Sequence, residues 1–336
     1  MSTQEFKLLL AITNHDNYCK FYLSKTKDII VYVLATDEWY KYDNILNVYV
    51  ILDLNEITNM VISDLQRHFM DELEYNKKLM NTEKNTEDEL LISNNRKITK
   101  LLINIGNTPN INSIIKRLSQ ILTNNKFIDK LDWSINKLQF KNGYVDLKTG
   151  QLIKRTKDDY ITKYIDYDYT NIVDENEQNK IMNILLKIFN NDKVLLTNML
   201  EIAGYTITGL MKEPIIMILN GFIACNGKST YFKMMSSILE DTYSYKLNNR
   251  TFEASYNNNH KYISNIDKKR FISIEECSEE NQNSSLLKSI CDGGKIDNEK
   301  LYGTTEKIYV NSVSYIAMNG VFKLKTDNGS KRRLKY

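Results

Sequence analysis

The chain has 336 residues, of which 42% are hydrophobic and 26% charged, a composition typical of a globular protein with two or three domains. The formal net charge is only +3, so a nucleic-acid-binding surface would have to be local rather than global. The four cysteines lack paired metal-ligand spacing, and no run of 18 apolar residues occurs. These features argue against a structural zinc site and a membrane partner, and they favour a reducing compartment.

The first half of the chain mixes short strands with amphipathic helices. Residues 29–34 and 38–42 are rich in β-branched and aromatic side chains, which predicts two strands. Apolar residues recur at helical spacing over 57–80 and again over 111–125, so we predict a helix in each segment. The polar residues 81–97 between them are predicted to form a loop or the solvated start of a helix.

The next segments lead to a domain boundary. Residues 133–147 predict strands joined by a turn at Asn142-Gly143, and residues 178–204 predict one long helix. We place the boundary near residue 175. Residues 1–175 would form a mixed α+β N-terminal domain, and residues 176–336 would form an α/β domain.

A candidate phosphate-binding loop lies near the middle of the chain. The apolar segment 215–220 leads through Gly221 to Asn226-Gly227-Lys228-Ser229-Thr230, and a helical pattern follows. Gly227 would let the backbone approach phosphates, whose charge is held by N–H groups at the helix N-terminus. Lys228 would reach the β- and γ-phosphates, and the hydroxyl of Ser229 or Thr230 would bind Mg²⁺.

The loop departs from the usual spacing in its first half. The common pattern has a glycine six residues before the lysine, but that position is Phe222, and Gly221 stands one residue earlier. A glycine-capped turn that opens a core helix is therefore the alternative interpretation.

Three further motifs follow the loop. An apolar strand pattern over 271–274 ends in Glu275 and Glu276, which could hold Mg²⁺ and activate water; a strand ending in solvated glutamates is the alternative. Residues 308–318 predict another strand, which ends at Asn319. Arg332 and Arg333 are either surface charges or arginine fingers that reach the γ-phosphate of a neighbouring subunit.

In this order, the motifs resemble superfamily 3 helicases, and more closely the helicase part of the phage/plasmid primase family and its poxvirus-type relatives in large DNA viruses. The N-terminal part is similar to the domain that precedes this ATPase. The matching segments are 31–33, 39–42, 138–150, 202–205, Asn226–Thr230, Arg270–Glu276, 287–302, Met318-Asn319 and Gly329–Arg333.

The resemblance implies a P-loop ATPase core of the AAA+ type and an ATP-dependent DNA helicase that acts in viral or mobile-element replication. The expected cofactors are ATP and Mg²⁺, and the expected partners are single-stranded DNA, a homo-oligomeric ring, usually hexameric, and a separate primase. The protein would work at a viral replication site in the cytoplasm or nucleus of the host cell. The implied residues are Gly221, Asn226, Gly227, Lys228, Ser229 and Thr230 for nucleotide; Ser229, Thr230 and Glu275 for metal; Glu275, Glu276, Asn319, Arg332 and Arg333 for catalysis; and Lys295, Lys300 and Lys307 for DNA.

Two alternatives remain open. Family members continue beyond the arginine pair, so we expect an ATPase domain truncated at its C-terminus. With the altered phosphate loop, this favours a degenerate or partial replication protein that binds nucleotide or partners without unwinding. The near-neutral charge also permits a P-loop ATPase without DNA activity, and the three lysines would then be solvated surface residues.

Overall fold

In the structure, a computed structural model, the chain forms two compact units. The structure describes residues 3–82, 88–221, 226–255, 263–277, 281–299, 305–320, 322–323 and 328–335. The first unit comprises Met1–Leu131 and Thr156–Thr162, and the second comprises Asp132–Arg155 and Lys163–Tyr336. No helix in the described part of the chain is long and apolar enough to cross a membrane.

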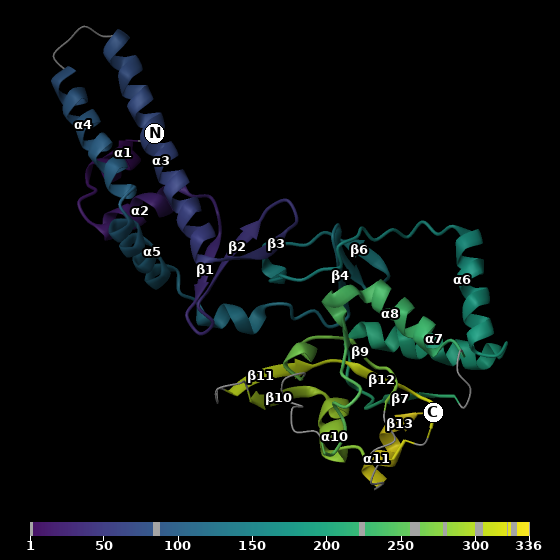
Figure 1. Cartoon of the computed structure of the whole chain (residues 1–336). Coiled ribbons are helices and arrows are strands. Elements are labelled where there is room, and N and C mark those ends of the chain that lie inside the picture. The colour runs from purple at the N-terminus through teal and green to yellow at the C-terminus, as the bar shows by residue number, and fades with distance from the viewer. Residues whose placement is uncertain are drawn as a thin grey trace. The chain divides into compact units, whose positions relative to one another are not determined.

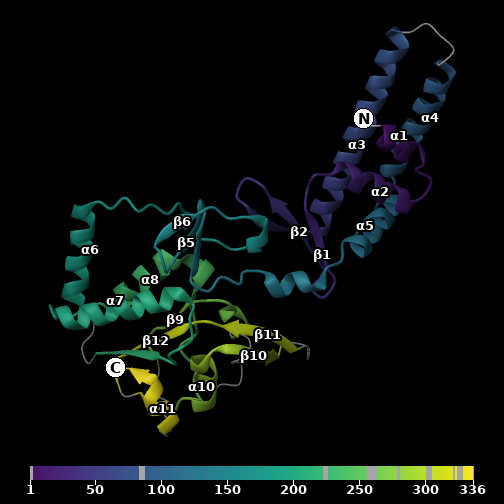
Figure 2. The same cartoon turned by 180° about the vertical axis from the view of Figure 1, so that it is seen from behind.

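The first unit combines helices with an antiparallel sheet of order β1-β2-β3. Strands β1 and β2 agree with the two predicted from aromatic and β-branched runs, whereas β3 was not predicted. The helix predicted over 57–80 is present as α3, and α4 begins at Asp88, within the segment for which a loop was one alternative. Helices α3 and α4 lie side by side (Figures 1 and 2). The elements are α1 (Thr3–Leu10), α2 (His15–Lys25), β1 (Ile30–Val33), β2 (Glu38–Asp43), β3 (Val48–Leu52), α3 (Leu54–Thr82), α4 (Asp88–Ile105), α5 (Thr108–Leu122) and the short 3₁₀ segments η1 (Asn125–Lys130) and η2 (Lys157–Asp159).

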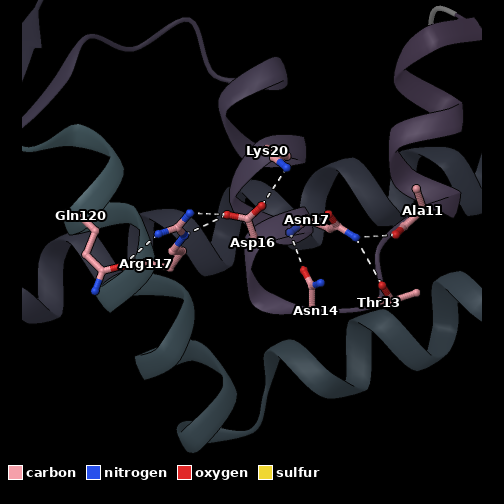
Figure 3. A network of polar contacts seen from close by, with 8 residues as sticks. All are labelled: Ala11, Thr13, Asn14, Asp16, Asn17, Lys20, Arg117 and Gln120. Atoms are coloured by element: carbon pink, nitrogen blue, oxygen red, sulfur yellow. Dashed lines mark hydrogen bonds and ion pairs between the residues drawn. The ribbon is translucent and has the colours of Figure 1, made fainter.

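A carboxylate network joins α2 to α5 in this unit. Asp16 contacts Lys20 one turn later on α2 and Arg117 on α5, each at 2.8 Å (Figure 3). Hydrogen bonds from Lys20 and Arg117 lower the pKa of Asp16. At the start of α2, the Asn14 side chain accepts the Asn17 N–H and caps the helix. These contacts fix the start of α2 against α5.

The second unit is built on a five-stranded parallel sheet of order β13-β7-β12-β9-β8. The chain is therefore α/β with a parallel sheet, as predicted. Its elements are β4 (Lys137–Phe140), β5 (Gly143–Asp146), β6 (Gln151–Ile153), α6 (Glu175–Ile188), α7 (Lys193–Thr208), β7 (Ile216–Asn220), α8 (Lys228–Tyr243), β8 (Ser244–Lys246), η3 (Ser264–Ile266), β9 (Phe271–Ile274), α10 (Ser284–Asp292), β10 (Gly294–Glu299), β11 (Thr305–Val310), β12 (Val313–Met318), α11 (Asn328–Arg333) and β13 (Leu334–Lys335).

Alternate residues of the central strands enter two different cores. Met217, Phe271 and Tyr315 pack with α7 and α8 on one face of the sheet, whereas Ile218 and Ile316 pack with α10 on the other. Figure 1 shows α7 and α8 on one side of the sheet and α10 on the opposite side. Both faces are covered, which explains why β9 and β12 are buried along their whole length and consist mostly of apolar residues.

Two predicted elements are each divided in the structure. The predicted helix over 178–204 is two helices, because Asn190 and Asn191 adopt left-handed conformations with φ of 53° and 59° and Asp192 caps α7. Helix α7 also continues past residue 204 to Thr208. The single strand predicted over 308–318 is β11 and β12, which belong to different sheets.

The compact units part at residue 131, whereas the sequence placed the boundary near residue 175. The difference arises from the antiparallel sheet β4-β5-β6. Its residues Leu138, Phe140 and Val145 share one hydrophobic cluster with α6, α7 and α8, so this sheet packs with the second unit.

A buried arginine fastens this small sheet to the parallel sheet. Arg270, directly before β9, is only 3% exposed. Its guanidinium donates to the carbonyls of Ser134 (2.7 Å), Lys137 and Ile207, and it lies 4.4 Å from the centre of the Tyr243 ring. One cation thus satisfies carbonyls from the loop before β4, from β4 itself and from α7.

We predict that Arg270→Leu lowers the free energy of unfolding by about 3 kcal/mol or more, because several buried carbonyls would lose their donor. Arg270→Lys should fall between this variant and wild type, since an ammonium cannot reach all three carbonyls. Urea unfolding measures the change. Lys212→Leu, at an exposed position in the same unit, is the control, and equal stability of Arg270→Leu and Lys212→Leu would contradict the prediction.

Candidate functional site

The candidate site lies where three parallel strands end together. In register, Asn220 of β7 pairs with Met318 of β12, and Ile274 of β9 pairs with Ile316. The residues that follow these strands therefore meet at the carboxyl edge of the sheet, where open α/β sheets bind ligands. They line one cavity of about 480 Å³, formed by Asn226, Gly227, Lys228, Ser229, Thr230, Glu275, Glu276, Ala317, Met318 and Asn319.

Gly227 begins helix α8 in a left-handed conformation with φ of 84°. A Cβ at this position would lie 2.7 Å from Cγ1 of Ile188 at the end of α6, so both the backbone and the packing favour glycine. Gly227 has no side chain with which to cap α8, and the residues of the first helical turn line the same cavity as Lys228. This helix end favours an anion. Residues 222–225 of the loop, including Phe222, lie outside the described residues.

Gly221 has a structural role despite its unusual spacing. A Cβ added to it would lie 1.8 Å from Nδ2 of Asn226 and 3.0 Å from Nζ of Lys228. A side chain at 221 would therefore displace the residues that enter α8. Gly221, although one position before the usual glycine of the motif, therefore allows Asn226 and Lys228 to lie close to the backbone.

Lys228 joins the loop to the end of β12. Its Nζ donates to Oδ1 of Asn319 at 2.7 Å, and burial lowers the pKa of Lys228. A negatively charged ligand in the cavity would favour the charged form of this lysine. The two residues are 91 positions apart, and the structure brings them together as the motif order predicts.

The two glutamates after β9 differ in their surroundings. Glu275 is partly buried and its Oε1 lies 3.0 Å from Nζ of Lys246, the last residue of β8. Glu276 is exposed and has a left-handed backbone with φ of 54°, a conformation that is uncommon for glutamate and recurs at functional sites. The next residue, Cys277, donates its N–H to the carbonyl of Ala317 at 3.1 Å, which ties this turn to β12.

The oxygen ligands in the cavity fit a magnesium ion. The hydroxyls of Ser229 and Thr230 are exposed at the start of α8, and the carboxylate of Glu275 lines the same space. Hydroxyl and carboxylate oxygens are ligands that Mg²⁺ accepts together with phosphate oxygens. The predicted metal ligands are thus brought together.

Arg333, one of the two arginines implied to contact a neighbouring subunit, is paired with a carboxylate of its own chain in the structure. Its guanidinium forms a two-pronged ion pair with Asp292 at the end of α10, and the Arg333 residue is 6% exposed. Asp292 stands at a helix C-terminus, where a carboxylate is unfavourable without a cation. Arg332 is exposed and stays the candidate for contact between subunits.

The predicted DNA-binding lysines lie in the β10–β11 hairpin. Lys295 is exposed on β10 and pairs in register with Tyr309, and Lys307 pairs with Asp297. Lys300 lies outside the described residues. The hairpin sequence 294–310 contains three lysines and three carboxylates, so its formal charge is zero.

A second cavity, which sequence reasoning missed, adjoins the first. Its volume is about 640 Å³, and it shares Asn226 and Lys228 with the site. It lies among the end of α6, helix α7 and strand β7, and its lining is mainly apolar. From the sequence, the spacing of apolar residues in α7 indicated a buried helix face but not a cavity beside it. The principal lining residues are Ile188, Phe189, Asn190, Leu195, Asn198, Met199, Ile202, Ile215, Met217, Leu219 and Tyr231.

The family described as D5 N terminal like matches residues 18–190, just over half of the chain. The chain belongs to this family. It is the D5-type viral primase-helicase family that the motifs resemble.

Two curated relatives come from large DNA viruses. A "Putative helicase" of Acanthamoeba polyphaga mimivirus is 30% identical over 146 residues, which is 44% of this chain and 15% of that protein. A "Putative helicase" of Invertebrate iridescent virus 3 is 32% identical over 107 residues, 31% of this chain and 11% of that protein. The matched segments thus span a small part of either relative.

Two solved structures of the NrS-1 C-terminal region in its A form without ligand are also similar. One has a TM-score of 0.44 and 11% identity, with 96% of this chain and 60% of that chain covered. The other has a TM-score of 0.33 and 16% identity, with 46% and 35% covered.

Because Arg333 holds α11 to α10, we predict that Arg333→Ala lowers the free energy of unfolding by about 2 kcal/mol. The expected loss is moderate because Asp292, the partner of Arg333, is partly exposed. Arg332→Ala, the adjacent exposed arginine, should change it by less than about 0.5 kcal/mol. Thermal and urea unfolding of both variants test this expectation. The ion-pair interpretation is wrong if Arg332→Ala destabilises the chain more than Arg333→Ala does.

Proposed function

We propose that this chain is an ATP-dependent DNA helicase of viral or mobile-element replication, with a P-loop ATPase core of the AAA+ type. The observation that carries the proposal is the hydrogen bond between Lys228 and Asn319 at 2.7 Å in a cavity that also contains two glutamates. A cation at a helix N-terminus, a polar sensor and carboxylates at one strand edge are the groups that phosphoryl transfer requires.

Each residue would then have a defined task. The N–H groups at the start of α8 and Lys228 would bind the β- and γ-phosphates, with Asn319 close to the γ-phosphate. Ser229 or Thr230 and Glu275 would hold Mg²⁺, which neutralises developing charge on the phosphate oxygens. Glu276 would accept a proton from the attacking water.

The second cavity supports a nucleotide rather than a simple phosphate as ligand. It shares the lining residues Asn226 and Lys228 with the phosphate site, and its lining combines apolar side chains with the amides of Asn190 and Asn198. Such a pocket suits an aromatic base with polar edges. A volume of about 640 Å³ accommodates a nucleobase with its ribose.

The helicase part of the proposal rests on the family and on the names of the two viral relatives. We propose a homo-oligomeric, hexameric ring in which exposed Arg332 acts at the subunit boundary. Single-stranded DNA would contact Lys295, Lys300 and Lys307. A separate primase is proposed as a partner, at a viral replication site in the host cytoplasm or nucleus.

A partial replication protein that binds nucleotide without unwinding is the second candidate. The hairpin that carries the three lysines has a formal charge of zero, which favours this candidate. Steady-state ATPase rates with and without single-stranded DNA separate the two. Hydrolysis stimulated by DNA supports the helicase, whereas binding of ATP without turnover supports the partial protein.

We predict that Lys228→Ala abolishes hydrolysis of Mg-ATP, because the β- and γ-phosphates would lose their neutralising cation. Lys233→Ala removes an exposed lysine from the same helix and is the matched control. A phosphate-release assay measures both, and unfolding midpoints establish that both variants are folded. Equal rates for Lys228→Ala and wild type would exclude the phosphate-binding role.

We further predict that Glu276→Gln keeps ATP binding but slows turnover by roughly 10²-fold or more, because the amide preserves shape and removes the base. Glu275→Gln should instead weaken the dependence on Mg²⁺. Single-turnover hydrolysis and binding of a fluorescent ATP analogue separate the two effects. A crippled Glu275→Gln beside a nearly normal Glu276→Gln would reverse the assigned roles.

A further inference from the structure

An exposed aromatic residue stands at the base of the β10–β11 hairpin. Trp133, in the loop before β4, is 47% exposed, although tryptophan is usually largely buried. Its indole packs against the ring of Tyr309 with the ring centres 5.0 Å apart and an interplanar angle of 79°. Lys295, the partner of Tyr309 in the hairpin, has its Nζ 5.4 Å from the centre of the same tyrosine ring. We call Trp133, Tyr309 and Lys295 the aromatic platform.

The backbone on the Trp133 side of the platform is held in place by several hydrogen bonds. The Ser134 carbonyl, directly after Trp133, accepts from buried Arg270 at 2.7 Å. Asn136 donates its N–H to the Thr208 carbonyl at 3.0 Å, and Asp132 accepts the Lys163 N–H at 3.1 Å. The indole is therefore presented on a fixed loop.

Tyr309 is held as firmly on the other side. Its N–H donates to Oδ1 of Asp267 at 2.7 Å, and its carbonyl accepts the N–H of Lys268 at 2.8 Å. Its neighbour Ile308 is only 1% exposed and packs in the hydrophobic core, which holds β11 in place. A platform fixed from both sides loses little conformational entropy when a flat ligand stacks on it.

Because the β10–β11 hairpin has no formal charge, an aromatic platform would supply DNA affinity that the charge of the hairpin cannot. Three lysines and three carboxylates leave the hairpin with no formal charge, so counterion release alone would give weak binding of a phosphate backbone. Base stacking on an aromatic ring contributes affinity without net charge, and an adjacent lysine adds a phosphate contact. Exposed aromatic surface next to a cation is the chemistry that recognises an unpaired base.

We propose that Trp133, supported by Tyr309 and flanked by Lys295, is a stacking site for an unpaired base of single-stranded DNA. This inference rests on the proposed DNA-binding function and assigns part of the binding to a residue outside the helicase motifs. Because stacking does not release counterions, the contribution of Trp133 should persist at high salt, whereas that of Lys295 should decline.

The two tryptophans of the chain provide a direct test, since Trp39 is 3% exposed and Trp133 is 47% exposed. Titration of the wild-type chain with oligo(dT) should quench the exposed indole. The quenching should disappear in Trp133→Phe, which keeps an aromatic ring and should retain most of the affinity. Trp133→Ala should bind oligo(dT) about 10-fold more weakly at low and at high salt alike.

An abasic oligonucleotide of the same length is the matched ligand, because it keeps the phosphates and lacks the bases. It should bind without quenching, and with the same affinity for wild type and Trp133→Ala. Unchanged oligo(dT) affinity in Trp133→Ala, or no quenching of wild type on saturation, overturns the stacking site. If oligo(dT) binds through Trp133 in a chain that shows no ATP hydrolysis, the inference stands and the helicase proposal fails.

Discussion

The register of three parallel strands is the constraint on which the candidate site depends. Strand β12 lies between β7 and β9 and pairs with both, so its hydrogen bonds set the level at which all three strands end. A shift of one residue would exchange the residues that face α8 and α10, because alternate side chains enter opposite cores. The packing of alternate strand residues into these two cores therefore positions the site as well as the fold. Lys228, Glu275 and Asn319 meet because β7, β9 and β12 end at the same edge of the sheet.

Arg270 extends this constraint beyond the parallel sheet. It immediately precedes β9, whose far end leads to Glu275, and it binds carbonyls of Ser134, Lys137 and Ile207. The small sheet β4-β5-β6 is thereby tied to the strand that carries the acidic residues. Burying a cation among carbonyls costs desolvation free energy. Arginine is nevertheless favoured at this position, because few other side chains can donate to three carbonyls at once.

Local sequence patterns predicted much of the fold and the grouping of the site. The loop from Gly227 to Thr230 was found because glycine, lysine and hydroxyl residues at a helix start have distinct chemical tasks, and the strands before Glu275 and Asn319 were found from apolar runs. The partners Lys246 of Glu275 and Asp292 of Arg333 were not predicted, because each lies tens of residues away and nothing local marks the pairing. The break between α6 and α7 was missed because helical spacing resumes after it, although two consecutive asparagines are a signal for left-handed backbone.

Strand β12 also connects the two regions where ligands are proposed. Its first residue, Val313, follows the hairpin strand β11 after two residues, and its last, Met318, precedes Asn319. A six-residue strand is about 20 Å long at ~3.3 Å per residue, and β12 is buried along its whole length. Such a strand moves as a rigid element rather than bending. One buried strand therefore joins Asn319 to the base of the hairpin, where Tyr309 and Trp133 lie.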